Sequence, residues 1–186
     1  MSSRLKLKNK PIGIDIEIHR DRDKRINFKK IDAIRYLKNN NKKFDLILIK
    51  QTIHLLSINS IKNLVNECKK NLNTDGKIFI FTLDPFKNEI PSFELMKKKL
   101  KRSLQRDKMI LKFLSQLNSS KNSKKFFYKV KITKKKYLKM IQNRFISTLL
   151  PMTKKQISNG IKEIDLKFNK ILKFNDNLIC IILKKN

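Results

Sequence analysis

The segment Phe44–Lys50 reads FDLILIK and begins the stretch of sequence that decides the fold. A second apolar segment, KIFIFTL, follows at Lys77–Leu83. Segments that are apolar on both faces are typical of strands inside a parallel sheet that helices cover on each side. Between them we expect an amphipathic helix from about Ser57 to Leu72 and a tight turn at Thr74–Gly76. This stretch therefore predicts an α/β fold.

Polar residues follow both predicted strands. Lys50, Gln51 and His54 lie at or just after the end of the first strand, and Asp84 follows the second. Parallel sheets bind their ligands at the carboxyl ends of the strands. We therefore expect a ligand pocket at this edge of the sheet.

Length and composition predict a globular protein with one domain over residues 1–186. The chain is 40% hydrophobic, and it has no apolar run of the roughly 18 residues that a membrane span needs. Basic residues in Met1–Lys10 are not followed by an apolar segment, which argues against a signal peptide. Cys68 and Cys180 have no nearby cysteine, so we expect both to be reduced core residues and the protein to be cytoplasmic.

The formal net charge is +31, with 46 Lys and Arg against 15 Asp and Glu. Such a charge would attract nucleic acid or an anionic membrane. An alternative explanation is a genome rich in A and T, because the lysines accompany many Asn, Ile and Phe residues and are spread along the chain. Non-specific nucleic-acid binding at low salt is expected in either case.

The flanking sequence completes the predicted sheet. Arg4–Lys8 could form a short edge strand, and Ile12–Ile18 and Ile26–Ile31 are predicted strands. Asp32 could cap a helix that ends near Asn39.

The second half is predicted to be mainly helical. Helices are expected over Pro91–Leu117, with a solvated basic face, and after the capping residues Thr133 and Thr153, while Ser119–Ser123 is expected to be a flexible link. The chain is expected to close with an antiparallel pair, Ile171–Phe174 and Leu178–Leu183, joined by a turn at Asn175–Asn177.

This order of elements, with the residues at the strand ends, resembles the class I S-adenosylmethionine-dependent methyltransferases, and more narrowly their type-11 small-molecule group. The resemblance covers about residues 11–186 and implies a Rossmann-like sheet. It implies cofactor-side strands over 11–84, a helical acceptor-side region over 90–166 and a C-terminal hairpin over 168–185.

The resemblance also implies roles for single residues. IGIDI at Ile12–Ile16 is similar to the second strand of the family, whose acid binds the cofactor ribose, so Asp15 would have that role or be a solvated acid at the end of a loop. Asp32 and Ala33 look like the family's acid–alanine step, in which the acid binds the adenine amine and the next backbone N–H meets the ring. As a plain helix cap, Asp32 is equally well explained.

Further correspondences concern the donor and acceptor sides. Phe44–Ile49 resembles the fourth strand, which leads to the methyl donor, so Lys50 and Gln51 would contact cofactor or be ordinary polar residues at a strand end. Leu72–Ile78 is similar to the glycine turn before the fifth strand.

On the acceptor side, Tyr137–Leu149 resembles a helix that lines the acceptor, which makes Asn143 and Arg144 candidate substrate-binding residues. His54 could be a general base for a hydroxyl or carboxyl acceptor, or a histidine packed at the pocket wall.

One departure affects the prediction. The family begins with a central strand and a glycine-rich turn, E/DxGxGxG, and this sequence lacks both. Either the chain is a fragment, or the strands at Ile12–Ile18 and Phe44–Lys50 pair directly, or a partner chain fills the gap. We expect truncation.

The function predicted from the sequence is methyl transfer from S-adenosylmethionine to a small-molecule acceptor, without a metal, unless truncation has made the protein inactive. The alternative is a non-catalytic methyltransferase-like protein that binds RNA or a protein partner through its basic surface.

Overall fold

The computed structural model describes residue 7 and residues 9–18, 23–117 and 123–185. The predicted edge strand at Arg4–Lys8 and the link at Ser119–Ser123 lie almost wholly outside these residues. The chain divides into two compact units. Unit 1 comprises Met1–Ile47, Asn59–Lys77 and Lys184–Asn186, and unit 2 comprises Leu48–Ile58 and Ile78–Leu183.

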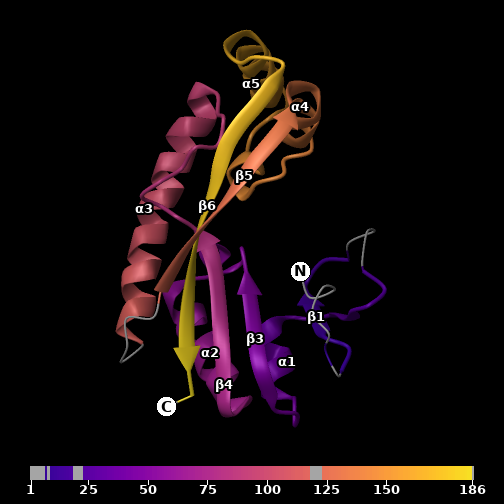
Figure 1. Ribbon diagram of the computed structural model, residues 1–186, viewed down its shortest axis with the longest axis vertical. Helices are drawn as coiled ribbons and strands as arrows, with labels where there is room; N and C mark the ends of the chain where they lie inside the picture. Colours follow the sequence, from indigo (N-terminus) through magenta and orange to yellow (C-terminus); the bar gives the residue numbers. More distant parts are fainter. Residues whose placement is uncertain (1–6, 8, 19–22, 118–122, 186) are drawn as a thin grey trace. The chain divides into compact units, whose positions relative to one another are not determined.

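The strands form two sheets (Figure 1). The smaller sheet pairs β1 (Ile12–Asp15) with β2 (Asn27–Lys30) in parallel, with Asp15 opposite Lys30. The larger sheet has the strand order β3-β4-β6-β5. Its strands are β3 (Phe44–Lys50), β4 (Leu72–Leu83), β5 (Ser123–Thr133) and β6 (Ile171–Lys184).

Strand directions in the larger sheet are mixed. The arrows of β3 and β4 point the same way in Figure 1, and that of β6 points the opposite way. β5 and β6 are antiparallel over their whole paired length, from Ser123 opposite Ile181 to Thr133 opposite Ile171.

Direct pairing of the strands at Ile12–Ile18 and Phe44–Lys50 is wrong, because β1 and β3 belong to different sheets. The burial expected of β3 on both faces is also wrong. Leu46 and Leu48 are 47% and 44% exposed, because β3 is the last strand of its sheet and pairs only with β4.

Two polar residues, Asp32 and Asn71, form hydrogen bonds at the two ends of a short helix in unit 1. Asp32 is the N-cap of α1 (Ala33–Lys38), as predicted, and its carboxylate accepts a hydrogen bond from the backbone of Arg35. Asn71 is buried, and its amide donates to the carbonyl oxygens of Leu37 and Glu67 at 2.9 Å each. These bonds join the end of α1 to the end of α2 (Ile58–Lys70).

The predicted apolar face of α2 is confirmed. Its buried residues recur at steps of three and four, and Cys68 is among them. Cys68 and Cys180 are both buried and unpaired, and burial raises the pKa of the Cys68 thiol to about 12.

Unit 2 has a helical core. It contains α3 (Glu94–Gln116), α4 (Lys134–Gln142), α5 (Lys154–Lys167) and the short 3₁₀ helices η2 (Ile53–Leu55) and η3 (Ser147–Leu149). The predicted caps Thr133 and Thr153 are confirmed, the second in a full capping box with Gln156. The buried core residues are Phe93, Met96, Tyr137, Ile141, Leu149, Met152, Ile157, Ile164 and Leu172.

Both predicted turns are wrong. Thr74–Gly76 lies inside β4, where a Cβ at Gly76 would be only 2.8 Å from the carbonyl oxygen of Phe44. Glycine therefore allows a close approach of two backbones there. Asn175–Asn177 lies inside β6 and pairs with Phe127–Lys129 of β5. The antiparallel pair at the sheet edge thus consists of β5 and β6, not of two halves of residues 171–183.

Candidate functional site

Two acids predicted to bind cofactor lie close together in unit 1. Asp15 ends β1, and its carbonyl oxygen accepts a hydrogen bond of 3.0 Å from the N–H of Ile31, next to Asp32. Asp15 Oδ1 also accepts from the N–H of Glu17 at 3.0 Å, and Asp32 Oδ1 accepts from that of Arg35 at 2.9 Å. A carboxylate has about four acceptor sites, so the bond from Arg35 leaves Asp32 able to accept more.

Ala33 is the first residue of α1. The first N–H groups of a helix have no partner within the helix, so the Ala33 N–H suits an acceptor on a ligand. Asp15, Asp32 and Ala33 therefore lie together at the carboxyl ends of two parallel strands.

Lys50 and Gln51 lie where β3 ends, in unit 2. Gln51 has a φ of 56°, which is uncommon outside glycine, and its N–H donates to the carbonyl oxygen of Phe81 at 2.9 Å. The positive charge of Lys50 acts on the carboxyl group of Asp176. Burial raises the pKa of Asp176, and the positive charge of Lys50 opposes that rise.

His54 is half-buried in η2 and has polar neighbours. Its Nε2 is 3.3 Å from Ser147 Oγ, and η2 and η3 both pack against α3. Burial lowers the pKa of His54, and the negative charge of Asp107 opposes this effect. The imidazole is therefore neutral at neutral pH and able to accept a proton.

Asp107 of α3 is unusual in this region because it is an acidic residue that is buried. It is only 5% exposed, and its Oδ1 has no hydrogen-bond partner among the described residues. Burial raises the pKa of Asp107, while His54 and Arg106 lower it. The sequence did not single out this residue, because in a helix rich in charged side chains nothing local shows that this one is buried.

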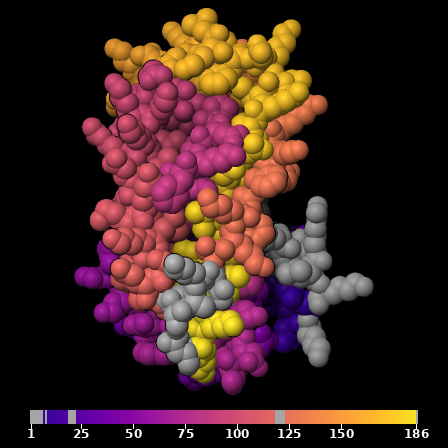
Figure 2. All heavy atoms as spheres, turned by 60° about the vertical axis from the view of Figure 1, so that its left-hand side comes forward, coloured from indigo at the N-terminus to yellow at the C-terminus, as the bar shows by residue number. Residues whose placement is uncertain are grey.

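A pocket of about 360 Å³ lies beside His54, between α3, η2 and η3. Its polar lining includes Lys99, Arg102, Ser103 and Arg106 from α3 and Ser147 from η3. The α3 residues recur at steps of three and four, which places them on one side of the helix. Figure 2 brings α3 toward the viewer, with its side chains standing out from the surface. The solvated basic face predicted for this helix therefore includes one wall of a pocket.

Asn143 and Arg144 are not among the residues that line this pocket. Asn143 is the C-cap of α4 and is exposed. Arg144 has a φ of 52°, and its guanidinium donates to the carbonyl oxygens of Leu150 at 3.1 Å and Met152 at 2.7 Å. These bonds fold the chain back after α4, which ends at Gln142, well before the predicted Leu149.

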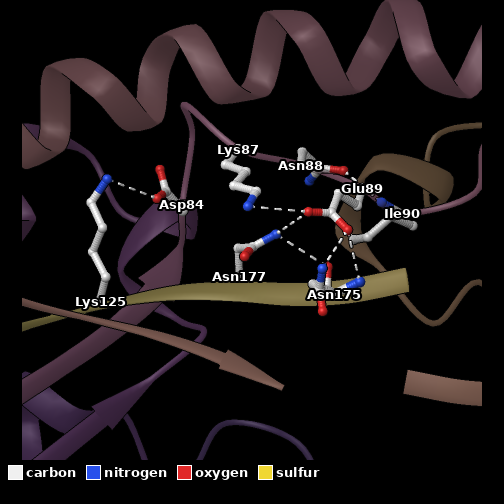
Figure 3. A network of polar contacts seen from close by, with 8 residues as sticks. All are labelled: Asp84, Lys87, Asn88, Glu89, Ile90, Lys125, Asn175 and Asn177. Carbon is white, nitrogen blue, oxygen red and sulfur yellow. Dashed lines mark hydrogen bonds and ion pairs between the residues drawn. The ribbon is translucent and has the colours of Figure 1, made fainter. Parts of the chain in front are cut away.

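Asp84, expected at the pocket edge, is instead part of a structural network (Figure 3). It is buried, its Oδ1 accepts from the N–H of Phe86 at 2.9 Å, and its Oδ2 lies 3.4 Å from Lys125 Nζ. Glu89 accepts from the backbone and the side chain of Asn175, at 3.0 and 2.8 Å. The hydrogen bond from the Asn175 backbone is the main reason why the pKa of Glu89 is lowered. These bonds hold Asn175 in an extended strand.

In the described part of the chain, neither another pocket, nor a metal site, nor a membrane span adds candidate residues to the site. A larger hollow of about 780 Å³ is lined by residues of α4 and α5 and by none of the predicted site residues. The described residues contain no group of three or more His, Cys, Asp or Glu side chains that could hold a metal ion. Across the described ranges, no helix is long and apolar enough to cross a membrane.

Comparison with known proteins identifies the fold. No protein-family description matches the sequence, and no curated protein matches it either. Among solved structures, a protein from Anabaena variabilis, named as a methyltransferase from an antibiotic biosynthesis pathway, matches 91% of this chain and 80% of its own. The TM-score is 0.57 at 13% sequence identity. This chain therefore shares the Rossmann-like α/β fold of that protein.

Weaker similarities involve the same class of protein. A SAM-dependent methyltransferase from Archaeoglobus fulgidus is 22% identical, with 94% of this chain and 75% of that one covered and a TM-score of 0.45. The plantazolicin methyltransferase BamL, solved with a triazolic desmethylPZN analog and SAH, is 15% identical, with coverage of 100% and 71% and a TM-score of 0.48. The Anabaena structure alone confirms the predicted Rossmann-like α/β fold.

Proposed function

We propose that this protein binds S-adenosylmethionine and transfers its methyl group to a small-molecule acceptor. The observation that carries the proposal is the pair of acids, Asp15 and Asp32, at the carboxyl ends of two parallel strands in a methyltransferase fold. A ribose diol donates two hydrogen bonds, and the adenine amine donates further ones, so carboxylates suit both.

The proposed roles follow the fold. In unit 1, Asp15 binds the ribose hydroxyls, Asp32 binds the adenine amine, and the Ala33 N–H meets the ring. For Lys50 and Gln51 of unit 2, contact with cofactor stays a prediction from the sequence resemblance, as does acceptor binding by Asn143 and Arg144. The cofactor, when bound, supplies a methyl group activated by a sulfonium. His54, neutral at neutral pH, accepts the proton of a hydroxyl acceptor, whereas a carboxylate acceptor is already ionised and needs no base.

Isothermal titration with S-adenosylhomocysteine tests this proposal. We expect binding by the wild type, and a loss of about tenfold in the Asp15→Asn variant, which keeps the shape but removes the charge that strengthens the hydrogen bonds. Glu17→Gln is the matched control, because it removes an exposed carboxylate from the same loop. No heat at millimolar ligand, or equal losses in both variants, would contradict the proposed roles.

RNA binding without catalysis is a second candidate function, and one observation favours it. Phe127 and Tyr128 of β5 are 71% and 70% exposed and lie between exposed lysines. Exposed aromatic rings beside cations suit stacking on single-stranded bases. Selective RNA binding that survives about 150 mM salt, without binding of S-adenosylhomocysteine, would favour this function over methyl transfer.

A further inference from the structure

The pocket beside His54 has an excess of positive charge. Lys99, Arg102 and Arg106 line it, and no Asp or Glu does. Within the described residues, none of these three cations has an acidic oxygen within 4.0 Å. The side chains of Arg102 and Arg106 are exposed, and Arg106 is held by a hydrogen bond of 2.8 Å to the carbonyl oxygen of Leu56.

The nearest acid does not neutralise this charge. Asp107 is buried and interacts electrostatically with His54 and Arg106, but it is not part of the lining. It can offset one positive charge at most. Lys99 and Arg102 therefore leave the lining positive even with a neutral His54.

The hydroxyl groups of the lining and the volume of the pocket further limit the kinds of ligand that it can bind. Ser103 and Thr148 join Ser147 in the lining, so hydrogen-bond donors lie among the cations. The volume of about 360 Å³ is at the small end of ligand pockets, which suits a small molecule.

We infer that this pocket binds a small molecule through an oxyanion, a carboxylate or a phosphate group, held by Arg102 and Lys99 with hydroxyl donors beside it. The guanidinium of Arg102 can form two parallel hydrogen bonds to such a group, and Lys99 adds a point charge. That this molecule is the methyl acceptor rests on the proposed function. In that case His54 lines the pocket that holds the acceptor.

Isothermal titration of the full chain with citrate, and separately with inorganic phosphate, at about 150 mM salt tests the inference. The variant Lys99→Gln/Arg102→Gln removes two pocket cations. Lys97→Gln/Lys101→Gln removes two exposed cations of the same helix that do not line the pocket. Both variants lower the net charge equally, and thermal unfolding checks that both remain folded.

We expect the pocket variant to lose about tenfold in affinity and the control to change less than about twofold. Tighter binding of citrate than of phosphate would support a carboxylate ligand, and the reverse would support a phosphate. Equal losses in the two variants, or no binding of either probe by the wild type, would overturn the inference. Titration with S-adenosylhomocysteine separates the two proposals. Probe binding without cofactor binding would overturn the methyltransferase function alone, and cofactor binding without probe binding would overturn the anion pocket alone.

Discussion

The β1–β2 pair of unit 1 and the helical core of unit 2 differ in how completely they bury their apolar residues. Every residue of β1 is half-buried, and Ile16 and Ile18 just after it are 62% and 56% exposed. In unit 2, Tyr137 and Phe93 are almost fully buried. Similar apolar patterns thus reach very different burial, because a pattern predicts which face can be covered and not whether another element covers it.

Two glycine substitutions should show this difference most strongly. A Cβ at Gly160 in α5 would lie 2.5–2.6 Å from the ring of Phe93, which is itself buried, while a Cβ at Gly13 in β1 would meet mainly a methyl of half-buried Ile26, at 2.7 Å. We expect Gly160→Ala to lower the free energy of unfolding by about 2 kcal/mol, because overpacking outweighs the gain of about 1 kcal/mol in helix propensity. Gly13→Ala should cost less than about 1 kcal/mol, because the Ile26 side chain can move.

Urea unfolding followed by circular dichroism measures both changes. A larger loss for Gly13→Ala than for Gly160→Ala would show that the β1–β2 pair is packed more tightly than its exposure indicates. Equal losses would remove the contrast between the two regions.

Local signals in the sequence predicted most elements, and long-range contacts account for the errors. The runs at Phe44–Lys50 and Pro91–Leu117 and the caps Asp32, Thr133 and Thr153 depend on neighbours in the sequence, and all are confirmed in their essentials. Asn and Asp favour turns locally, but Glu89 and the pairing with β5 hold Asn175–Asn177 in a strand. β5 was missed because its lysines and exposed rings do not alternate as a half-buried strand does.

The residues of the candidate site divide in the same way, into those that local sequence patterns predict and those that only long-range contacts bring together. The acids of unit 1 stand out because they follow apolar strands, and His54 because it follows β3. The pocket cations were not recognised, because Lys99 and Arg102 have the spacing of any solvated helix face, and η3 lies more than 40 residues further along the chain. Their steps of three and four were the available signal, but only the packing of η3 against α3 makes that face a pocket wall.

Helix caps give a smaller test of the same comparison. Asp32→Ala and Thr153→Ala each remove a side-chain cap, and each should cost about 1 kcal/mol of local stability. Because α1 has six residues and α5 lies on a buried core, we expect Asp32→Ala to increase amide hydrogen exchange in α1 and β2 without affecting α5. Thr153→Ala should increase exchange in α5 with little effect on α1. If each variant increased exchange equally in both helices, the two units would be one cooperative structure.

The smallest expected effect concerns the contribution of Asp107 to stability. This acid is buried in unit 2, whereas Asp32 of unit 1 is exposed. Burial raises the pKa of Asp107, so the folded state holds this proton more tightly than the unfolded state does. The resulting stability is present below the unfolded carboxyl pKa of about 4 and is lost as pH rises through the higher folded value. Asp107→Asn removes this loss, and we expect the variant to be a few tenths of a kcal/mol more stable than wild type at neutral pH. Below about pH 4 the advantage should vanish.

His54 provides a readout that a change in packing alone would not produce. The negative charge of Asp107 raises the His54 pKa against the effect of burial, so Asp107→Asn should lower that pKa further. NMR titration of the imidazole measures this shift, and His54→Gln assigns the signal between the two histidines of the chain. Since protonation of His54 disfavours the folded state, its contribution to stability is lost as pH falls below about 6.5, and this loss should persist in Asp107→Asn. An unchanged or higher His54 pKa in the variant would mean that the Asp107 carboxylate is not charged beside the pocket.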